Sequence, residues 1–166
     1  MKCLIVGDYH DLPVKGSLDK LIETEKPTHL ISLGDFDIIK SIEEFAEIAK
    51  RCRRRGIAVI DVPGNHDHAV YTNLSWVISP TLLRAGTNIT ELNSELQGSR
   101  TAKAYLENLL RPETIVKKLQ WKKFNIAIVH GAYLGDTSTF DHFREEHFNY
   151  LWYRLVHESY ESSLMV

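Results

Sequence analysis

Short apolar runs alternate with amphipathic segments along the first sixty residues of the chain. The apolar runs at residues 2–7, 29–33 and 57–62 have the length and the composition of buried β-strands. The segments between them, residues 17–25 and 41–55, have the spacing of α-helices. Strands that alternate with helices are joined by right-handed crossovers, so this pattern predicts an α/β fold on a largely parallel sheet.

The second predicted helix has the clearest boundaries. Ser41 and Glu44 have the spacing of a capping box, in which side chains satisfy the free amides of a helix N-terminus. The arginines at positions 51 and 53–55 precede Gly56, and they suit the dipole of a helix C-terminus better than a nucleic-acid surface. The face that we expect to be buried carries Ile42, Phe45, Ile48, Ala49 and Cys52.

Residues 69–123 have a different character, because proline and glycine divide them into several segments of helical pattern. We expect helices over residues 74–84, 91–97, 102–110 and 113–122. Two interpretations stay open: these helices cover the sheet, or they form a helical insertion that caps the functional site. Strand character returns at residues 124–129.

Composition narrows the class of protein. The 166 residues suit one domain that spans residues 1–166, and the apolar fraction of 43% is typical of a globular protein. A net charge of −2 gives no electrostatic support for a nucleic-acid partner. The two cysteines are too few for a disulfide scaffold, and no apolar run has the length of a membrane span or the position of a signal peptide. We therefore expect a cytoplasmic protein without a membrane partner.

The predicted strands end on side chains of the kind that bind metal ions. Asp8 and His10 follow the first strand, and Asp35 follows the second. Asn-His-Asp at residues 65–67 follows the third strand, and His130 follows the last. Functional loops of a parallel sheet lie beyond the carboxyl ends of its strands, so we expect these side chains to form one site.

Carboxylates and imidazoles together suit Mn, Fe, Zn or Ni better than Ca or Mg. Asp8 and His10 are two residues apart, so an extended segment would place both side chains on one side, where they can bind one ion. Asp35 can bridge two ions through its two oxygens, and Asn65 and His130 can bind the second ion. Two ions held in this way activate a bridging water and stabilise displacement at phosphorus.

The neighbours His66 and Asp67 are candidates for a catalytic imidazole–carboxylate pair, in which the acid orients the histidine and raises its basicity. Taken singly, an acid or an asparagine at a strand end is better explained as a helix cap or a turn residue. A single histidine there is equally well explained as a hydrogen-bonded residue at the rim. The joint arrangement of these residues favours the metal site.

Four blocks carry a resemblance to the calcineurin-like metallophosphoesterases, and they occur in the family's order: Asp8-x-His10, Gly34-Asp35, Gly64-Asn65-His66-Asp67 and Val129-His130-Gly131. The resemblance covers residues 1–131 and implies a four-layer αββα sandwich with a binuclear metal centre that hydrolyses phosphate esters. By position it implies that Asp8 and His10 bind the first metal, Asp35 bridges, and Asn65 and His130 bind the second. It also implies that His66, partnered by Asp67, helps to donate a proton to the leaving group.

The chain departs from the family pattern in two places. The family often has a second acid three residues after the bridging aspartate, whereas Asp37 follows Asp35 by two, so we do not expect Asp37 to be a ligand. The closing Gly-His-x-His block is absent, and no histidine after His130 is preceded by glycine; these histidines are His142, His147 and His157. Either the chain is a shortened family member with a truncated second sheet, or a histidine of the tail replaces the missing ligands.

The tail at residues 139–160 has the pattern of an aromatic helix. His147 lies on the apolar face of this helix, which favours a packed histidine over a metal ligand, and we expect His142 and His157 to face solvent. Tryptophan, tyrosine and phenylalanine are enriched in interface cores, so a homodimer through this helix is a hypothesis.

Three functions stay open at this point. The first is a metal-dependent hydrolase of phosphate esters, whose substrate is a phosphorylated small molecule, a phosphoprotein or a small phosphodiester. The second is a catalytically weakened family member that acts through binding or assembly, which the missing final block supports. The third is a nuclease, which the mild acidity of the chain and its lack of interleaved basic and aromatic residues disfavour.

Overall fold

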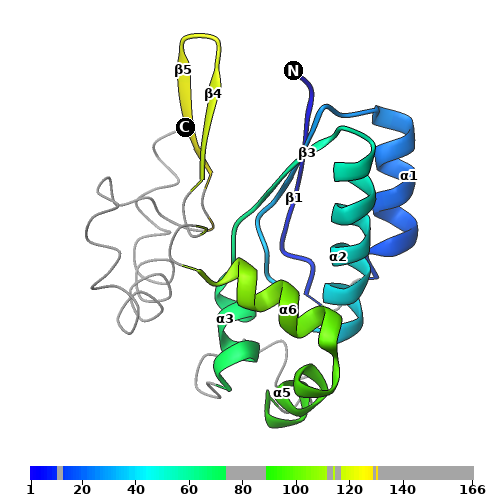
Figure 1. Ribbon diagram of the computed structural model, residues 1–166, viewed down its shortest axis with the longest axis vertical. Helices are drawn as coiled ribbons and strands as arrows, with labels where there is room; N and C mark the ends of the chain where they lie inside the picture. The colour runs from blue at the N-terminus through cyan, green and yellow to red at the C-terminus, as the bar shows by residue number, and fades with distance from the viewer. Residues whose placement is uncertain (11–12, 74–88, 112–113, 115–116, 129, 131–166) are drawn as a thin grey trace.

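A computed structural model describes residues 1–10, 13–73, 89–111, 114, 117–128 and 130 of the chain (Figure 1). The elements in order are β1 (Cys3–Val6), α1 (Lys15–Glu25), β2 (His29–Ser32), α2 (Ile39–Arg54), β3 (Ala58–Asp61), α3 (Asn65–Thr72), α5 (Ile89–Gly98), α6 (Arg100–Leu109), β4 (Lys117–Trp121) and β5 (Phe124–Ile128). The structure therefore confirms the four predicted strands and the first two predicted helices, with shifts of a few residues at their ends.

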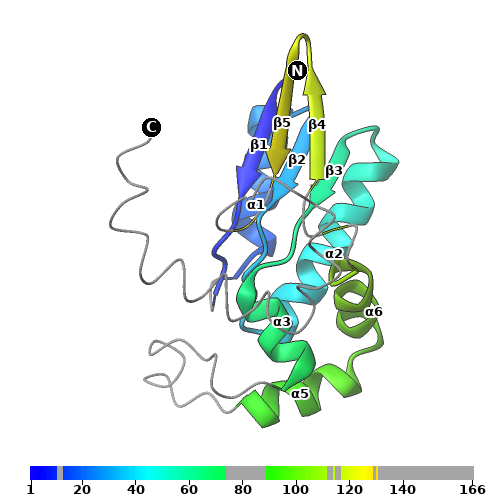
Figure 2. The same ribbon diagram turned by 90° about the vertical axis from the view of Figure 1, so that its left-hand side faces the viewer.

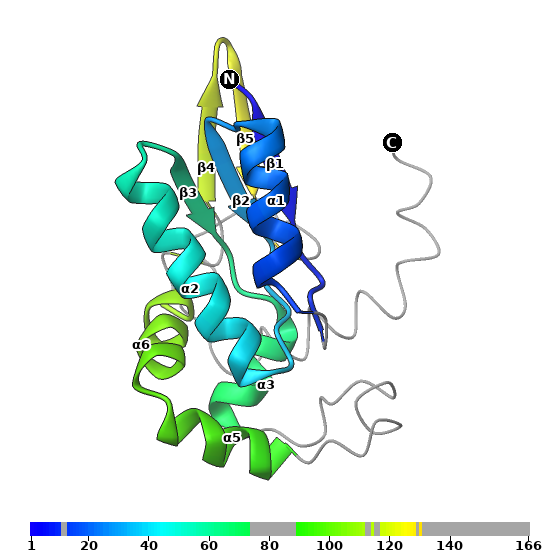
Figure 3. The same ribbon diagram turned by 90° about the vertical axis from the view of Figure 1, so that its right-hand side faces the viewer.

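The first three strands form one parallel sheet, as predicted, and they lie in the order β1-β2-β3. Helices α1 and α2 cover one face of this sheet (Figure 3), and the antiparallel β4-β5 hairpin lies against the other face (Figure 1). The described residues thus form an α layer and two β layers in a mixed α/β fold. The fourth layer of the predicted sandwich stays a prediction.

The two faces of the parallel sheet bury different sets of side chains, because successive residues of a strand point to opposite faces. Leu30 of β2 packs into the larger cluster together with α1 and α2, whereas its neighbour Ile31 packs with Ile128 of the hairpin. The predicted apolar face of α2 is buried at every position, which includes Ile42, Phe45, Ile48, Ala49 and Cys52. Burying one large aliphatic or aromatic side chain of this kind stabilises the fold by about 1.5–3 kcal/mol.

The predicted capping box of α2 is wrong. The helix begins at Ile39, and Ser41 lies in its first turn rather than ahead of it. Ile39 is itself buried, so the apolar face that drives helix formation starts before Ser41. The carboxylate of Glu44 accepts the backbone N–H of Lys15 at 3.0 Å and so connects α2 to the start of α1.

The arginines of the run lie at the C-terminal end of α2, as predicted, and three of them form ion pairs that connect this helix to its neighbours. Arg51 pairs with Asp19 of α1, and Arg55 pairs with Glu23 of α1. Arg53 pairs with Asp61 at the end of β3, with 2.9 Å between Nη2 and Oδ2.

Helices α5 and α6 confirm two of the four helices expected between residues 69 and 123, and the expected helix at 74–84 lies outside the described residues. The helix expected at 113–122 is wrong, because residues 117–121 form strand β4. Its Leu119 lies opposite Ile126 of β5 and packs onto the parallel sheet. The alternation Lys118-Leu119-Gln120-Trp121 gives each face of a strand one kind of side chain, which a helix would not do.

Helices α3, α5 and α6 lie beyond the carboxyl ends of the parallel strands (Figures 1 and 2). Among the described helices, none has both the length and the apolar character needed to cross a bilayer. The C-terminal helix predicted at 139–160, with His142, His147 and His157, lies outside the described residues.

Candidate metal centre

The loops that follow β1 and β2 continue to pair after the two strands end. The backbone N–H of Asp8 donates to the carbonyl oxygen of Gly34 at 3.1 Å, and the N–H of His10 donates to the carbonyl oxygen of Asp35 at 2.8 Å. The N–H of Asp37 in turn donates to the carbonyl oxygen of His10 at 3.2 Å. These bonds fix the register in which residues of the first loop face residues of the second.

Three residues of these loops have a left-handed backbone that is uncommon for residues other than glycine: φ is 52° at Asp8, 45° at His10 and 67° at Asp35. Between them, Tyr9 and Phe36 turn into the core and stack with 4.4 Å between ring centroids. The expectation that Asp8 and His10 lie on an extended segment is therefore wrong. Buried aromatic rings hold the loops in a strained conformation, which is a recurrent property of functional sites.

The first group of ligand-type side chains consists of Asp8, Asp35 and His130, whose ligand atoms lie within 4.8 Å of one another. Nε2 of His130 lies 3.3 Å from Oδ2 of Asp35, and Nδ1 donates to the carbonyl oxygen of Leu33 at 2.7 Å. A backbone carbonyl that accepts the other ring N–H in this way fixes the orientation of metal-binding histidines in proteins. The structure thus brings together three of the predicted ligands.

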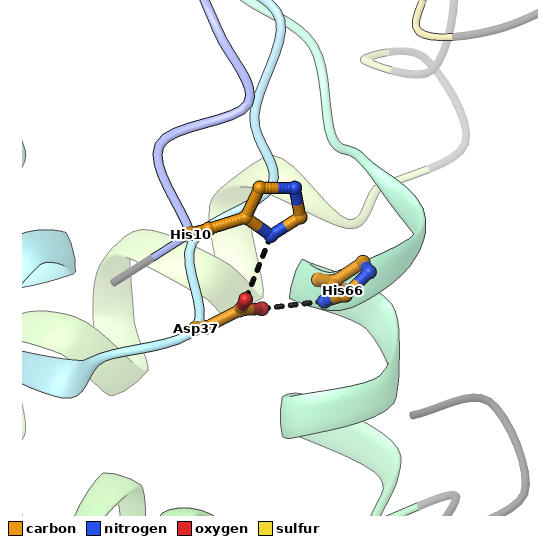
Figure 4. Close-up of side chains that lie close together, drawn as sticks. All are labelled: His10, Asp37 and His66. Atoms are coloured by element: carbon orange, nitrogen blue, oxygen red, sulfur yellow. Dashed lines mark hydrogen bonds and ion pairs between the residues drawn. The ribbon is translucent and has the colours of Figure 1, made fainter. Parts of the chain in front are cut away.

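The second group consists of His10, Asp37 and His66 (Figure 4). Oδ2 of Asp37 lies 2.7 Å from Nδ1 of His10, and Oδ1 lies 2.5 Å from Nδ1 of His66. The two imidazole rings meet nearly edge to face, with 4.8 Å between their centroids. The side chain of Asp37 is buried, whereas the side chain of His10 is 38% exposed, so the group opens to solvent on the side of His10.

Asp37 is a functional candidate in the structure, although the sequence did not lead us to expect it to be a ligand. The available signal was the spacing Asp35-Phe36-Asp37, which matches Asp8-Tyr9-His10 in placing an aromatic residue between two polar ones. Both central residues are buried, so the flanking side chains project to the same edge of the sheet. His10 is therefore grouped with Asp37, and its predicted sharing of one ion with Asp8 stays a prediction.

The predicted pairing of His66 with Asp67 is wrong. Adjacent residues on a helix do not face each other, and both belong to the first turn of α3. The fully buried carboxylate of Asp67 instead accepts three backbone N–H groups: Oδ2 accepts from Asp35 at 3.0 Å and from Gly64 at 2.8 Å, and Oδ1 accepts from Phe36 at 3.1 Å. Asp67 thus joins the loop after β2 to the loop after β3.

Two glycines allow these loops to approach so closely. A Cβ atom on Gly64 would lie 1.9 Å from Oδ1 of Asp35. Gly34 has a φ of 75°, and a Cβ atom there would lie 2.4 Å from both Oδ2 of Asp67 and the backbone nitrogen of Gly64. Any larger residue at either position would displace the Asp35 loop.

The pKa values of Asp35 and His130 shift in opposite directions because the two groups interact. Burial alone would raise the pKa of Asp35, but the hydrogen bond and the positive charge of His130, together with the charge and the backbone N–H of His66, outweigh burial and lower it. Burial likewise opposes the charged form of His130, yet Asp35 raises its pKa to about 9. In the metal-free protein the pair therefore holds a proton at neutral pH.

Two further groups at the site have raised pKa values. Burial would lower the pKa of His66, but the hydrogen bond and the negative charge of Asp37 raise it overall. For Asp67, burial is the largest cause, and together with the negative charge of Asp35 it raises the pKa to about 7 against the opposing effect of the backbone donors.

The residues present fit divalent metal ions. Carboxylate and imidazole donors lie together, and His10 and His130 each direct Nδ1 to an oxygen acceptor, which leaves Nε2 as the nitrogen for an ion. Gly34 and Gly64 allow the loop that carries Asp35 to pack directly against the loop after β3. The side chain of Asn65 lies outside the described residues, so its role as a ligand stays a prediction.

Comparisons with known proteins identify the family of the chain. The family model of the calcineurin-like phosphoesterase superfamily domain matches residues 1–158. No curated protein sequence and no solved structure matches the chain at a significant level. Because the family model spans nearly the whole chain, the protein belongs to the calcineurin-like phosphoesterase superfamily.

Proposed function

We propose that this protein hydrolyses phosphate esters with two divalent metal ions bound at the carboxyl ends of the parallel strands. One observation carries the proposal: two adjoining groups of ligand-type side chains meet there, in a chain of the calcineurin-like phosphoesterase superfamily. Mn, Fe, Ni and Zn are the candidate metals, because the donors are carboxylates and imidazoles.

Asp35 is the candidate bridging ligand. Its Oδ2 faces His130 in the first group, and its Oδ1 accepts the backbone N–H of His66, a member of the second group, at 3.0 Å. Its position between the two groups supports the role of a carboxylate shared by two ions. When bound, two such ions lower the pKa of a bridging water and stabilise negative charge at phosphorus.

The side chains of the protein supply the proton transfer. A carboxylate only accepts hydrogen bonds, so Nδ1 of His66 carries the proton that it shares with Asp37. In this role His66 is a proton donor and not a metal ligand, and His10 is the candidate ligand of the second group. Protonated His66 holds a second proton on Nε2, which it can donate to the leaving oxygen of the ester. The raised pKa of His66 supports this role, because it increases the fraction of protonated histidine near neutral pH.

The substrate classes that we propose are phosphomonoesters, phosphoproteins and small phosphodiesters. Asp8 and the imidazole of His10 are partly or largely exposed, so a phosphate group can reach the site from solvent. Release of product from p-nitrophenyl phosphate, from its bis-substituted diester and from a phosphopeptide would separate these classes.

The test compares the wild-type chain with Asp35→Asn in the presence of Mn²⁺. We expect a loss of turnover of about 100-fold or more, because an amide cannot bridge two cations as a carboxylate does. Asp19→Asn is the matched control: Asp19 is a surface residue of α1 that pairs with Arg51, so this change should leave turnover unaltered. Wild-type turnover in Asp35→Asn would overturn the proposal.

A further inference from the structure

The loops after β1 and β2 share one pattern, in which an aromatic residue lies between two residues that can bind a metal. The first loop reads Asp8-Tyr9-His10, and the second reads Asp35-Phe36-Asp37. In each loop the first residue belongs to the group of His130, and the third residue belongs to the group of His66. The two aromatic residues therefore lie at the boundary between the two ligand groups.

The backbone places the two patterns in register. The parallel pairing of β1 with β2 extends to a bridge between His10 and Phe36. The rings of Tyr9 and Phe36 meet face to face, with 4.4 Å between their centroids and 8° between their planes. Because protein interiors are closely packed, one loop cannot slide past the other without separating these rings.

The stack is part of a larger buried cluster of aromatic rings. Phe45 of α2 contacts both members, with 5.7 Å between its centroid and that of Tyr9 and 5.3 Å to that of Phe36. Tyr105 of α6 meets Phe36 nearly edge to face, with 6.4 Å between centroids. Helices α2 and α6 carry no member of either ligand group, so within this cluster the stack alone belongs to the ligand loops.

The conformation of the flanking ligands depends on this packing. Asp8, His10 and Asp35 have left-handed backbone, which is energetically costly for residues other than glycine. Such a conformation persists where the surrounding structure fixes it. The buried stack supplies this constraint, because each of these three residues is covalently next to one of its rings.

We propose that Tyr9 and Phe36 are positioning residues, whose stacking sets the separation of the two ligand groups so that two divalent ions can share Asp35. The rings act through the flanking ligands and do not themselves bind metal or substrate. This inference rests on the proposed function, because it requires two ions. Loss of the stack weakens binding of the second ion, while the first ion still binds to the ligands of one group.

The experiment titrates Mn²⁺ into the metal-free full-length chain and follows it by electron paramagnetic resonance. Two Mn²⁺ ions that share a ligand give an exchange-coupled signal, whereas separate ions do not. In Phe36→Leu we expect the affinity for the second Mn²⁺ to fall about tenfold or more, and the coupled signal at two equivalents to fall with it. Activity is not needed for this readout.

Phe45→Leu is the matched control, because it removes the same atoms from the same buried cluster but leaves the stack in place. Thermal unfolding should show a similar loss of stability in both variants, yet Phe45→Leu should keep the coupled signal. Tyr9→Phe retains the ring and should keep the signal as well. Tyr9→Leu should lose it, and this variant replaces Phe36→Leu if circular dichroism shows that the latter does not fold.

The outcomes separate this inference from the proposed function. A coupled signal of wild-type strength in Phe36→Leu or Tyr9→Leu would overturn the positioning role and leave the two-metal site intact. Equal weakening by Phe45→Leu would also overturn it, since a general loss of packing would then explain both variants. Fewer than two ions in the wild type would overturn the proposed function, and the inference with it.

Discussion

Oδ1 of Asp37 lies 2.5 Å from Nδ1 of His66, although the two residues are 29 positions apart in the sequence. The acid that follows His66 directly, Asp67, contacts backbone amides instead. The two acids near this histidine therefore have different roles. Asp37 orients the imidazole and raises its pKa, whereas Asp67 holds the surrounding loops together.

We predict that Asp37→Asn lowers kcat for phosphate ester hydrolysis by about 100-fold and leaves the fold intact. Asparagine keeps the shape of the side chain but removes the negative charge that raises the pKa of His66. If protonated His66 donates to the leaving group, kcat falls as the pH rises through the pKa of His66. In Asp37→Asn the pKa of His66 is lower, so kcat falls at a lower pH than in the wild type.

A pH profile of kcat for the wild type and Asp37→Asn, together with thermal unfolding of both, checks this prediction. A purely structural role for Asp37 would lower the melting temperature without moving the alkaline limb of the profile. An unchanged limb in a stably folded variant would therefore show that His66 is not the proton donor.

Asp67→Ala should destabilise the protein by about 3 kcal/mol or more, because three backbone N–H groups would lose their buried acceptor. Urea denaturation followed by circular dichroism measures this change. Glu47→Ala is the comparison, since Glu47 forms only an exposed pair with Lys50 and should cost less than about 0.5 kcal/mol. Equal stabilities for the two variants would contradict the role assigned to Asp67.

The glycines offer a test of the close approach between loops. Gly64→Ala should abolish metal binding, because its Cβ would overlap the carboxylate of Asp35. Gly16→Ala lies in helix α1 with no atom within 4 Å of the added Cβ, so it should bind metal normally and be about 0.4–1 kcal/mol more stable than the wild type. Metal titration and thermal unfolding of the two variants would separate the effects, and normal metal binding by Gly64→Ala would refute the proposed packing.

Metal binding should release a proton from His130. Its pKa of about 9 means that the imidazole is protonated at pH 7.5 in the metal-free protein, and only the neutral imidazole binds an ion. Metal affinity should therefore rise by about tenfold per pH unit below pH 9 and level off above it, if this proton is the only one released. Calorimetric titrations in two buffers of different ionisation enthalpy measure the protons released; His130→Gln should release about one fewer, and an equal release would contradict the prediction.

Strong periodicity made much of the fold predictable from the sequence. Three apolar runs separated by amphipathic helices predict strands that run parallel in one sheet. The carboxyl ends of parallel strands lie at the same edge of the sheet. The convergence of Asp8, Asp35 and His130 follows from this topology. Strand β4 was missed because its five residues include three polar ones, and its strand pattern becomes clear only when it pairs with β5.

The partners within the site could not be predicted in the same way. The contact of Asp37 with both histidines depends on left-handed backbone at His10 and Asp35. Aspartate and histidine are enriched in that conformation but adopt it too rarely for the sequence to predict it. The role of Asp67 depends on the point where α3 begins, because a residue in the first turn of a helix can reach the free amides before it. Both features follow from backbone geometry rather than from residue type.

The number of metal ions per chain tests the central claim most directly. Plasma mass spectrometry of protein purified without chelators and dialysed should find about two equivalents of Mn, Fe, Ni or Zn in the wild type. Asp35→Asn should retain at most about one equivalent, because the proposed bridging carboxylate is lost. One equivalent or none in the wild type, with no increase when metal is added, would contradict a binuclear phosphoesterase.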